Sequence, residues 1–164
     1  MTDQSNHQKA KSGSKTARRT AARLAAVQAY YQMLSNEQKA DDVIEEFKMH
    51  RLGKPVDDNE MVLPDGVLFT KIVKGVTQRS DDLSSIIDTF LAARDSTKSS
   101  KTLESLETLL RSILLCGSFE LLAHHDIDAP IIIADYLDIS HAFFESGEAK
   151  LVNAALDHVN KAVR

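Results

Sequence analysis

The chain has 164 residues, of which 43% are hydrophobic and 27% are charged, which is the balance of an ordinary globular protein. Aromatic residues make up only 5%, and there are only 3 prolines and 6 glycines, which disfavours a β-sandwich. No uncharged apolar run approaches the roughly 20 residues of a membrane-spanning helix. The single Cys116 excludes an internal disulfide or a multi-cysteine zinc site.

The charge is distributed unevenly along the chain. Residues 1–23 carry six basic side chains against Asp3 alone, which gives +5, whereas the remainder carries 14 basic and 23 acidic side chains, which gives −9. A basic arm on an acidic body predicts an anionic partner, and RNA, DNA, an anionic membrane or an acidic protein would all serve. A solvated tail without a partner is the alternative. The first thirty residues lack the apolar stretch of a secretory signal, so we expect a cytoplasmic protein.

Hydrophobic spacing predicts an all-α fold of about seven helices and no sheet. Residues 1–15 are polar and aperiodic, which predicts a disordered basic tail before a helical domain at 16–164. The first helix is expected at about 16–34, capped by Thr16 or a neighbour. Its apolar stripe contains Thr20, Leu24, Val27, Tyr31 and Leu34.

Six further helices are expected. Five of them lie at about 36–51, from Pro64 through Val76, and at about 80–93, 102–123 and 128–144. Ser146-Gly147 is expected to break the chain before a seventh helix, which contains Leu151, Val152, Ala155, Leu156 and Val159. Residues 94–100 form a polar connector, which divides the domain into two sub-bundles, about 16–95 and 101–164, that share a core. Gly117 lies inside the fifth helix, where it predicts either a closely packed neighbour or a bend.

The first helix is the best candidate for a binding site. Guanidinium groups form paired hydrogen bonds with phosphate and stack on bases, and a tyrosine can stack an unpaired base. A helix face that carries arginines beside a tyrosine therefore favours single-stranded RNA as its ligand. In the alternative interpretation, the arginines only add solubility and the tyrosine is packing. At 100° per residue, one stripe beside Ala22 and Ala26 contains Lys15, Arg19, Arg23 and Tyr30.

Three segments resemble the NusB family. Ala17-Arg18-Arg19, Arg23 and the run AVQAYY at 26–31 resemble its arginine-rich opening helix, which typically continues into AVQALY. KLVNAALD at 150–157 is similar to the family's KFVNGVLD, and FELL at 119–122 is similar to its YELL. The segments follow one another in order, so the resemblance covers about residues 16–163.

The resemblance implies two small helical bundles and an RNA-binding transcription antitermination factor that is not an enzyme and needs no cofactor. Such proteins bind the boxA element of nascent ribosomal RNA together with NusE, a small-subunit ribosomal protein, and join the antitermination complex on RNA polymerase. The resemblance leaves open whether the free protein is a monomer or a homodimer. It implies RNA contacts by Arg19, Arg23, Tyr31, Phe143, Lys150 and Asn153, to which charge and helix geometry add Lys15, Arg18 and Tyr30.

This chain also departs from the family pattern. The family's INEA stretch is Ile133-Ala134-Asp135-Tyr136 here, its ExxILR pattern loses the Glu and the Arg at 110–115, and a common acidic position is Gly147. These changes put the NusE-contacting surface in more doubt than the basic arm.

Two other functions are open. His124-His125-Asp126 could hold a divalent metal and activate water, as in a phosphohydrolase, although adjacent residues rarely all face one ion. A helical adaptor that binds only proteins is the other. Cys116, on an apolar helix, is expected to be a small buried hydrophobe. Asp135 and Asp138, which have no evident partner, are expected on a solvated face.

Overall fold

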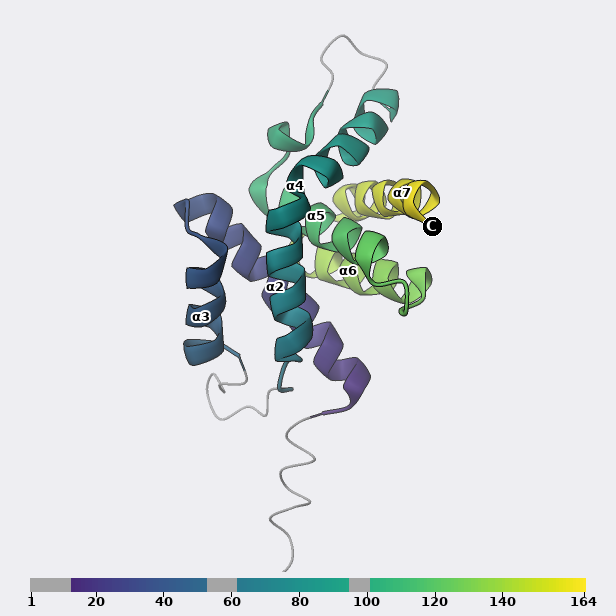
Figure 1. Ribbon diagram of the computed structural model, residues 1–164. Helices are drawn as coiled ribbons and strands as arrows, with labels where there is room; N and C mark the ends of the chain where they lie inside the picture. The colour runs from purple at the N-terminus through teal and green to yellow at the C-terminus, as the bar shows by residue number, and fades with distance from the viewer. Residues whose placement is uncertain (1–12, 53–61, 95–100) are drawn as a thin grey trace, which may run out of the picture.

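The computed structural model describes residues 13–52, 62–94 and 101–164. Within them the chain is helical and contains no strand, which confirms the all-α prediction (Figure 1). Most of the predicted tail and the predicted connector lie outside the described residues, so the tail and the division into sub-bundles stay predictions. The elements are α2 (Lys15–Asn36), α3 (Ala40–His50), α4 (Gly66–Arg94), the 3₁₀ helix η1 (Leu103–Ser105), α5 (Thr108–Ala123), α6 (Ala129–Phe143) and α7 (Ser146–Val163).

Helix α2 begins one residue earlier than expected because Ser14, rather than Thr16, caps it. The Ser14 hydroxyl accepts a hydrogen bond from the Ala17 amide at 3.1 Å, which satisfies one of the free N–H groups of the first turn. The helix ends at Asn36, because the next residue, Glu37, has a left-handed φ of 53° and donates its N–H to the Met33 carbonyl.

The third and fourth predicted helices are one 29-residue helix, α4. The expected break at Ser80 was wrong because the buried stripe continues through it, from Val73 and Val76 to Leu83 and Ile87. Thus the polar stretch around Ser80 lies on the solvent side of a continuous helix that is about 43 Å long.

The fifth predicted helix, in contrast, is split into η1 and α5. Glu107 caps α5 because its carboxylate accepts hydrogen bonds from the Leu109 and Leu110 amides. Buried Leu103 in η1 donates its N–H to Asp88 of α4 at 2.7 Å, which fastens the start of the C-terminal half to α4.

Helix α5 forms the centre of the molecule and packs on α2, α4, α6 and α7. In Figure 1, α3 lies at one side, α5, α6 and α7 gather at the other, and α2 and α4 pass between them. Gly117 has the close neighbour that was one of the two expectations: a Cβ there would lie 3.0 Å from Leu156 and 3.2 Å from Tyr136. Cys116 is fully buried, as expected, and burial raises the pKa of its thiol.

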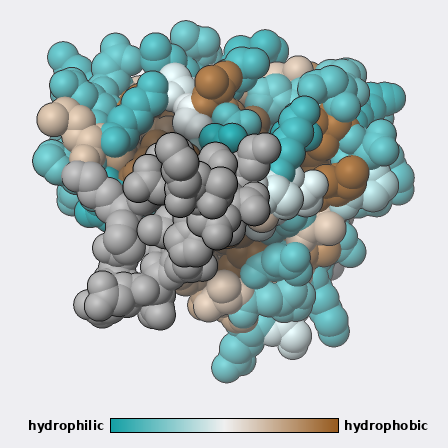
Figure 2. Space-filling view, turned by 90° about the horizontal axis from the view of Figure 1, so that it is seen from below, coloured by the Kyte–Doolittle hydropathy of each residue, from teal (hydrophilic) through white to brown (hydrophobic). Residues whose placement is uncertain are grey.

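None of the described helices is long and apolar enough to cross a lipid bilayer. Seen from below, the surface is mainly hydrophilic with small, separate hydrophobic areas (Figure 2). Few large hydrophobic side chains are exposed among the described residues. They are Tyr31, Met49, Leu63, Val67, Ile131 and Phe143.

Candidate nucleic-acid interface

Arg23 does not face solvent. Its side chain is 2% exposed and joins α2 to α5 and α6, so the prediction that it lies on an RNA-facing stripe was wrong. The guanidinium donates two hydrogen bonds to Glu120, at 2.7 and 3.2 Å, and one to Asp135 at 2.6 Å. The Thr20 hydroxyl donates a hydrogen bond to the same Asp135 oxygen. The sequence predicted that Asp135 lies on a solvated face, and this was wrong, because Asp135 is a partner in the network.

Glu120 is the centre of the network, because the Tyr136 hydroxyl donates to it at 2.7 Å and His124 Nδ1 lies 3.2 Å from it. Burial alone would raise the pKa of Glu120, but the hydrogen bonds with His124, Arg23 and Tyr136 and the charge of Arg23 lower it. Burial alone would lower the pKa of Arg23, but Glu120 and Asp135 raise it. The network therefore holds a buried charge of each sign.

The lowered pKa of Glu120 predicts a loss of stability in acid. Its contribution is complete above the ordinary glutamate pKa of about 4.3 and is lost as the pH falls through the lower pKa of the folded state. We expect the unfolding free energy of Glu120→Gln, measured in urea, to fall less steeply below about pH 4.3 than that of the native chain. Equal slopes for the two proteins would show that Glu120 does not cause the acid sensitivity.

The two neighbouring tyrosines have the reverse of the exposure that helix geometry predicted, and the exposed one is Tyr31, for which the resemblance implied a contact. Tyr30 is 6% exposed, and burial, followed by the nearby Cys116, raises its pKa to about 12, whereas Tyr31 is 41% exposed. Tyr30 lies about 20° from Arg23 around α2 and shares its buried face, while Tyr31 lies about 80° away. Tyr31, which was assigned to the core stripe, is thus the tyrosine that can meet a ligand.

Tyr31 lines a hollow together with Phe143, which lies 112 positions further along the chain at the end of α6 and is 45% exposed. This aromatic hollow has a volume of about 570 Å³. Its other lining residues are Gln28, Gln32, Ser35, Asn36, Arg51 and Leu109. Two exposed rings beside amide side chains and one guanidinium can stack an unpaired base and bond its edge.

Arg51, at the end of α3, is a functional candidate that the sequence analysis missed. Its guanidinium carbon lies 5.0 Å from the centre of the Phe47 ring. Its Nη2 lies 3.9 Å from Oε1 of Glu46, and this ion pair is exposed to solvent. Glu46 also accepts a hydrogen bond from Gln32 at 3.0 Å. Arg51 is therefore held at the hollow mainly by stacking, and its N–H groups can take a phosphate. The sequence carries no signal for Arg51, because this residue lies far from the basic arm at residues 1–23.

The other predicted contacts are on the surface but do not line this hollow. Lys150 and Asn153 are exposed, one turn apart, in the first two turns of α7. Lys15 is exposed at the first residue of α2. Arg18 is partly buried and donates from Nε to the Leu63 carbonyl at 3.1 Å, so part of its guanidinium holds the segment before α4 in place.

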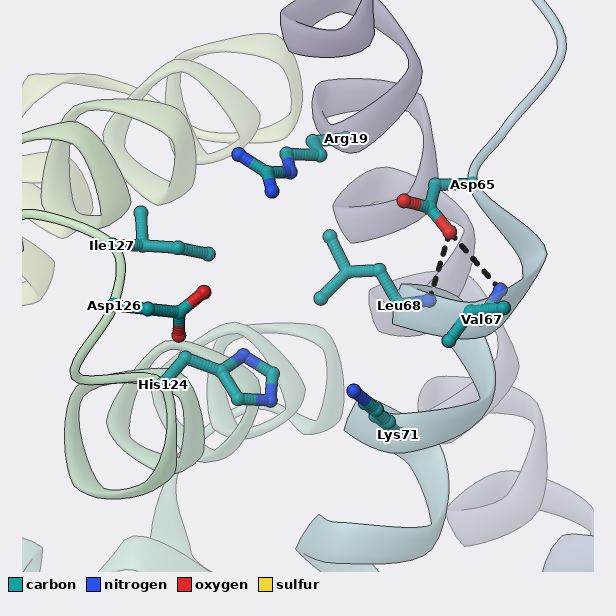
Figure 3. Close-up of a pocket in the computed structure, with 8 residues that line it drawn as sticks. All are labelled: Arg19, Asp65, Val67, Leu68, Lys71, His124, Asp126 and Ile127. Atoms are coloured by element: carbon teal, nitrogen blue, oxygen red, sulfur yellow. Dashed lines mark hydrogen bonds between the residues drawn. The ribbon is translucent and has the colours of Figure 1, made fainter.

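Arg19 lines a second hollow, about 110 Å³ in volume, between the start of α2, the start of α4 and the turn after α5. Figure 3 shows Arg19, Lys71, His124 and Asp126 turned toward this Arg19 hollow, with Leu68 between them. The sequence placed Arg19 and Tyr31 on one helix, and the structure separates them by about 18 Å along α2 and about 120° around it.

The histidine cluster is spread over different partners. His124 contacts Glu120, His125 Nε2 lies 2.8 Å from the Leu122 carbonyl, and Asp126 faces the Arg19 hollow. Among the described residues, no three His, Cys, Asp or Glu side chains are grouped so as to hold a metal ion. The geometry thus gives no support to the metal-dependent phosphohydrolase.

Comparison with known proteins agrees with the motifs read from the sequence. The family model described as the NusB family matches residues 20–161. The chain belongs to the NusB family. "Transcription antitermination protein NusB" of Novosphingobium aromaticivorans is 40% identical over 146 residues, which cover 89% of this chain and 95% of that protein. The protein of the same name from Rhizobium rhizogenes is 38% identical over 164 residues, covering 100% of this chain and 97% of that protein.

Solved NusB structures share the fold. "T. maritima NusB" has a TM-score of 0.68 at 20% identity and covers 87% of this chain and 90% of its own. A chain from a structure of the "Antitermination Factors NusB and NusE in complex with dsRNA" has a TM-score of 0.69 at 19% identity and covers 88% of this chain and 96% of its own. The family match over residues 20–161 includes Tyr31 and Phe143 of the aromatic hollow and every residue of the Arg23 network. Lys15, Arg18 and Arg19 lie before the matched range.

Proposed function

We propose that this NusB-family protein is a transcription antitermination factor that binds single-stranded boxA-like RNA of nascent ribosomal transcripts. The observation that carries the proposal is the aromatic hollow, where Tyr31 and Phe143 expose two rings beside Gln28 and Arg51. Rings that stack bases, an amide that reads a base edge and a guanidinium that binds phosphate are the features of single-strand recognition.

The comparisons support the same proposal. Relatives that match at about 40% identity over most of their length carry the name of antitermination proteins. A solved complex with the same fold contains NusB, NusE and double-stranded RNA, which supports RNA and NusE as partners. The preference for a single strand is argued from the aromatic hollow. We therefore propose NusE and the RNA polymerase antitermination complex as partners, a cytoplasmic location, and a regulatory rather than an enzymatic role.

The proposed contacts differ from those expected from the sequence by two removals and two additions. Arg23 and Tyr30 are withdrawn as direct contacts because both are buried. Gln28 and Arg51 are added because they line the aromatic hollow. The proposed surface residues that remain from the sequence are Lys15, Arg18, Arg19, Tyr31, Phe143, Lys150 and Asn153.

Removing either ring of the aromatic hollow is expected to weaken RNA binding. We expect Tyr31→Ala and Phe143→Ala each to lose roughly 5- to 150-fold in affinity for a short boxA-like RNA, since stacking contributes about 1–3 kcal/mol per base. Arg51→Gln should weaken binding to all sequences and reduce the salt dependence by about one phosphate contact. Fluorescence anisotropy over a salt series, with and without NusE and against a scrambled RNA, measures both effects.

Met49→Ala is the matched control. Met49 is an exposed hydrophobic side chain on α3 that does not line the hollow, so its loss should leave the affinity unchanged. The proposal fails if boxA-like and scrambled RNA bind equally, or if Tyr31→Ala and Met49→Ala bind alike. A double variant of Arg19 and Arg23 is not a suitable test, because loss of the buried Arg23 would destabilise the fold as well as remove a charge.

A further inference from the structure

The Arg19 hollow is separate from the aromatic hollow, and its lining combines basic and acidic groups. We propose that it binds one nucleotide unit of the RNA backbone, with the phosphate between Arg19 and Lys71 and the neighbouring ribose 2′-hydroxyl at Asp126. This inference rests on the proposed RNA-binding function and adds to it a second contact point, on α4 and on the turn between α5 and α6.

Arg19 and Lys71 supply the phosphate ligands. They come from different helices, α2 and α4, yet both side chains turn into the same hollow (Figure 3). Within the described part of the chain neither forms an ion pair, whereas Arg23, Arg79 and Lys161 do. Two cations that line one hollow and form no ion pair with its carboxylates can donate charge-assisted hydrogen bonds to a phosphate.

The two carboxylates of the hollow are not equivalent. Asp65 caps α4, because its Oδ1 accepts hydrogen bonds from the Val67 and Leu68 amides at 3.1 and 3.0 Å (Figure 3). Asp126 accepts no hydrogen bond from the other described residues and faces the cations across the hollow. A free carboxylate beside a phosphate site repels an inorganic anion but can accept the 2′-hydroxyl of a ribose, which favours RNA over DNA and over free phosphate.

The turn that carries Asp126 is held in place by hydrogen bonds from the C-terminal Arg164. The guanidinium of Arg164 donates to the carbonyls of Leu121, His124 and Ile127 at 2.8 to 2.9 Å. The His124 ring is held by Glu120 and packs edge-on against Phe119 at 5.4 Å. The turn that carries Asp126 is thus ordered before any ligand arrives, which reduces the entropy cost of binding there.

Inorganic phosphate tests the site without RNA. In a phosphate titration monitored by NMR, the ring signals of His124 should shift in a saturable way at millimolar phosphate. The ring signals of His50, which lies on α3 and does not line the hollow, are the internal reference. Lys71→Gln and Arg19→Gln should abolish the saturable shift. Lys74→Gln is the control for surface charge on α4, since Lys74 lies one turn further along, does not line the hollow and pairs only with the exposed Asp41 at 3.9 Å. Asp126→Ala should tighten phosphate binding by removing the repulsion.

Single-stranded RNA tests the source of the phosphate. Lys71→Gln should lower the salt dependence of RNA binding by about one contact, and Lys74→Gln should not. Asp126→Ala should weaken RNA binding although it strengthens phosphate binding, and it should have no such effect on the 2′-deoxy analogue. This reversal of sign is not expected from a merely structural role.

The outcomes separate the two proposals. If Tyr31→Ala loses RNA affinity while Lys71→Gln matches Lys74→Gln, the Arg19 hollow is not an RNA contact and the aromatic hollow remains. If no variant changes RNA binding, the proposed function fails as well. If phosphate shifts the His124 ring signals but Lys71→Gln leaves the salt dependence of RNA binding unchanged, the assignment to RNA is overturned. An acidic protein segment is then the alternative ligand.

Discussion

Replacing Arg23 with methionine is expected to cost about 3–5 kcal/mol of unfolding free energy. The reason is that Glu120 and Asp135 lose their buried counter-charge, while the hydrogen bonds that the guanidinium donates to them at 2.6 to 3.2 Å disappear. Methionine keeps most of the side-chain length, so the loss of charge and hydrogen bonds dominates over the change in volume. Urea unfolding at neutral pH measures the effect as a shift in midpoint.

Arg19→Met is the control for this variant. Arg19 lies one turn earlier on the same helix, is partly exposed and has no ion pair among the described residues, so the expected change is within about 0.5 kcal/mol. Combining Arg23→Met with Glu120→Gln and Asp135→Asn should recover part of the loss, because no unpaired carboxylate remains. If Arg23→Met is no more destabilised than Arg19→Met, the network does not hold α2 to α5 and α6.

Gly75→Ala is expected to destabilise the chain by about 1–3 kcal/mol or more. Gly75 is buried in α4, and a Cβ at this position would overlap the ring of Phe119 on α5, so one of the two helices would have to move. An exposed helical glycine would show the opposite sign, since alanine is the better helix former by about 1 kcal/mol. Thermal unfolding of the variant should therefore show a clearly lowered Tm.

Two further variants separate crowding from helix propensity. A Cβ at Gly147, in the first turn of α7, would meet nothing within 4 Å, so Gly147→Ala should be neutral or stabilising. Gly75→Ala combined with Phe119→Leu should recover stability relative to Gly75→Ala, because the smaller side chain makes room. A Tm for Gly75→Ala that equals or exceeds the native value would contradict the close approach of α4 and α5.

The helices could be predicted from local pattern, but their ends depended on contacts that the pattern does not contain. Helix α6 begins and ends close to expectation, because Pro130 is a local signal. The break expected at Ser146-Gly147 was wrong, because these are the first two residues of α7 and the chain turns at Phe144 and Glu145 instead. The polar stretch at Ser80 has the composition of a helix start, yet burial on either side keeps α4 continuous. Conversely, the helix expected at 102–123 divides because Glu107 caps α5, which apolar periodicity does not register.

The candidate site was harder to predict because its residues depend on partners far along the chain. Arg23 has the sequence context of an RNA-binding arginine, and only Glu120, 97 positions away, explains its burial. Tyr30 and Tyr31 differ by 100° around α2, and the apolar pattern alone gave them the reverse exposure. Arg51 and Lys71 carry no motif, so only the packing of α3 and α4 against α2 identifies them.

The length of α4 also limits how the molecule can move. This helix packs on α2 and α3 and also on α5 and α7, and no loop interrupts it between the two sets of contacts. The described structure therefore has no hinge within α4 about which its N-terminal and C-terminal helices could open like independent domains. We expect such an architecture to unfold as one cooperative unit, so that a ligand bound at either hollow would stabilise the helices around the other as well.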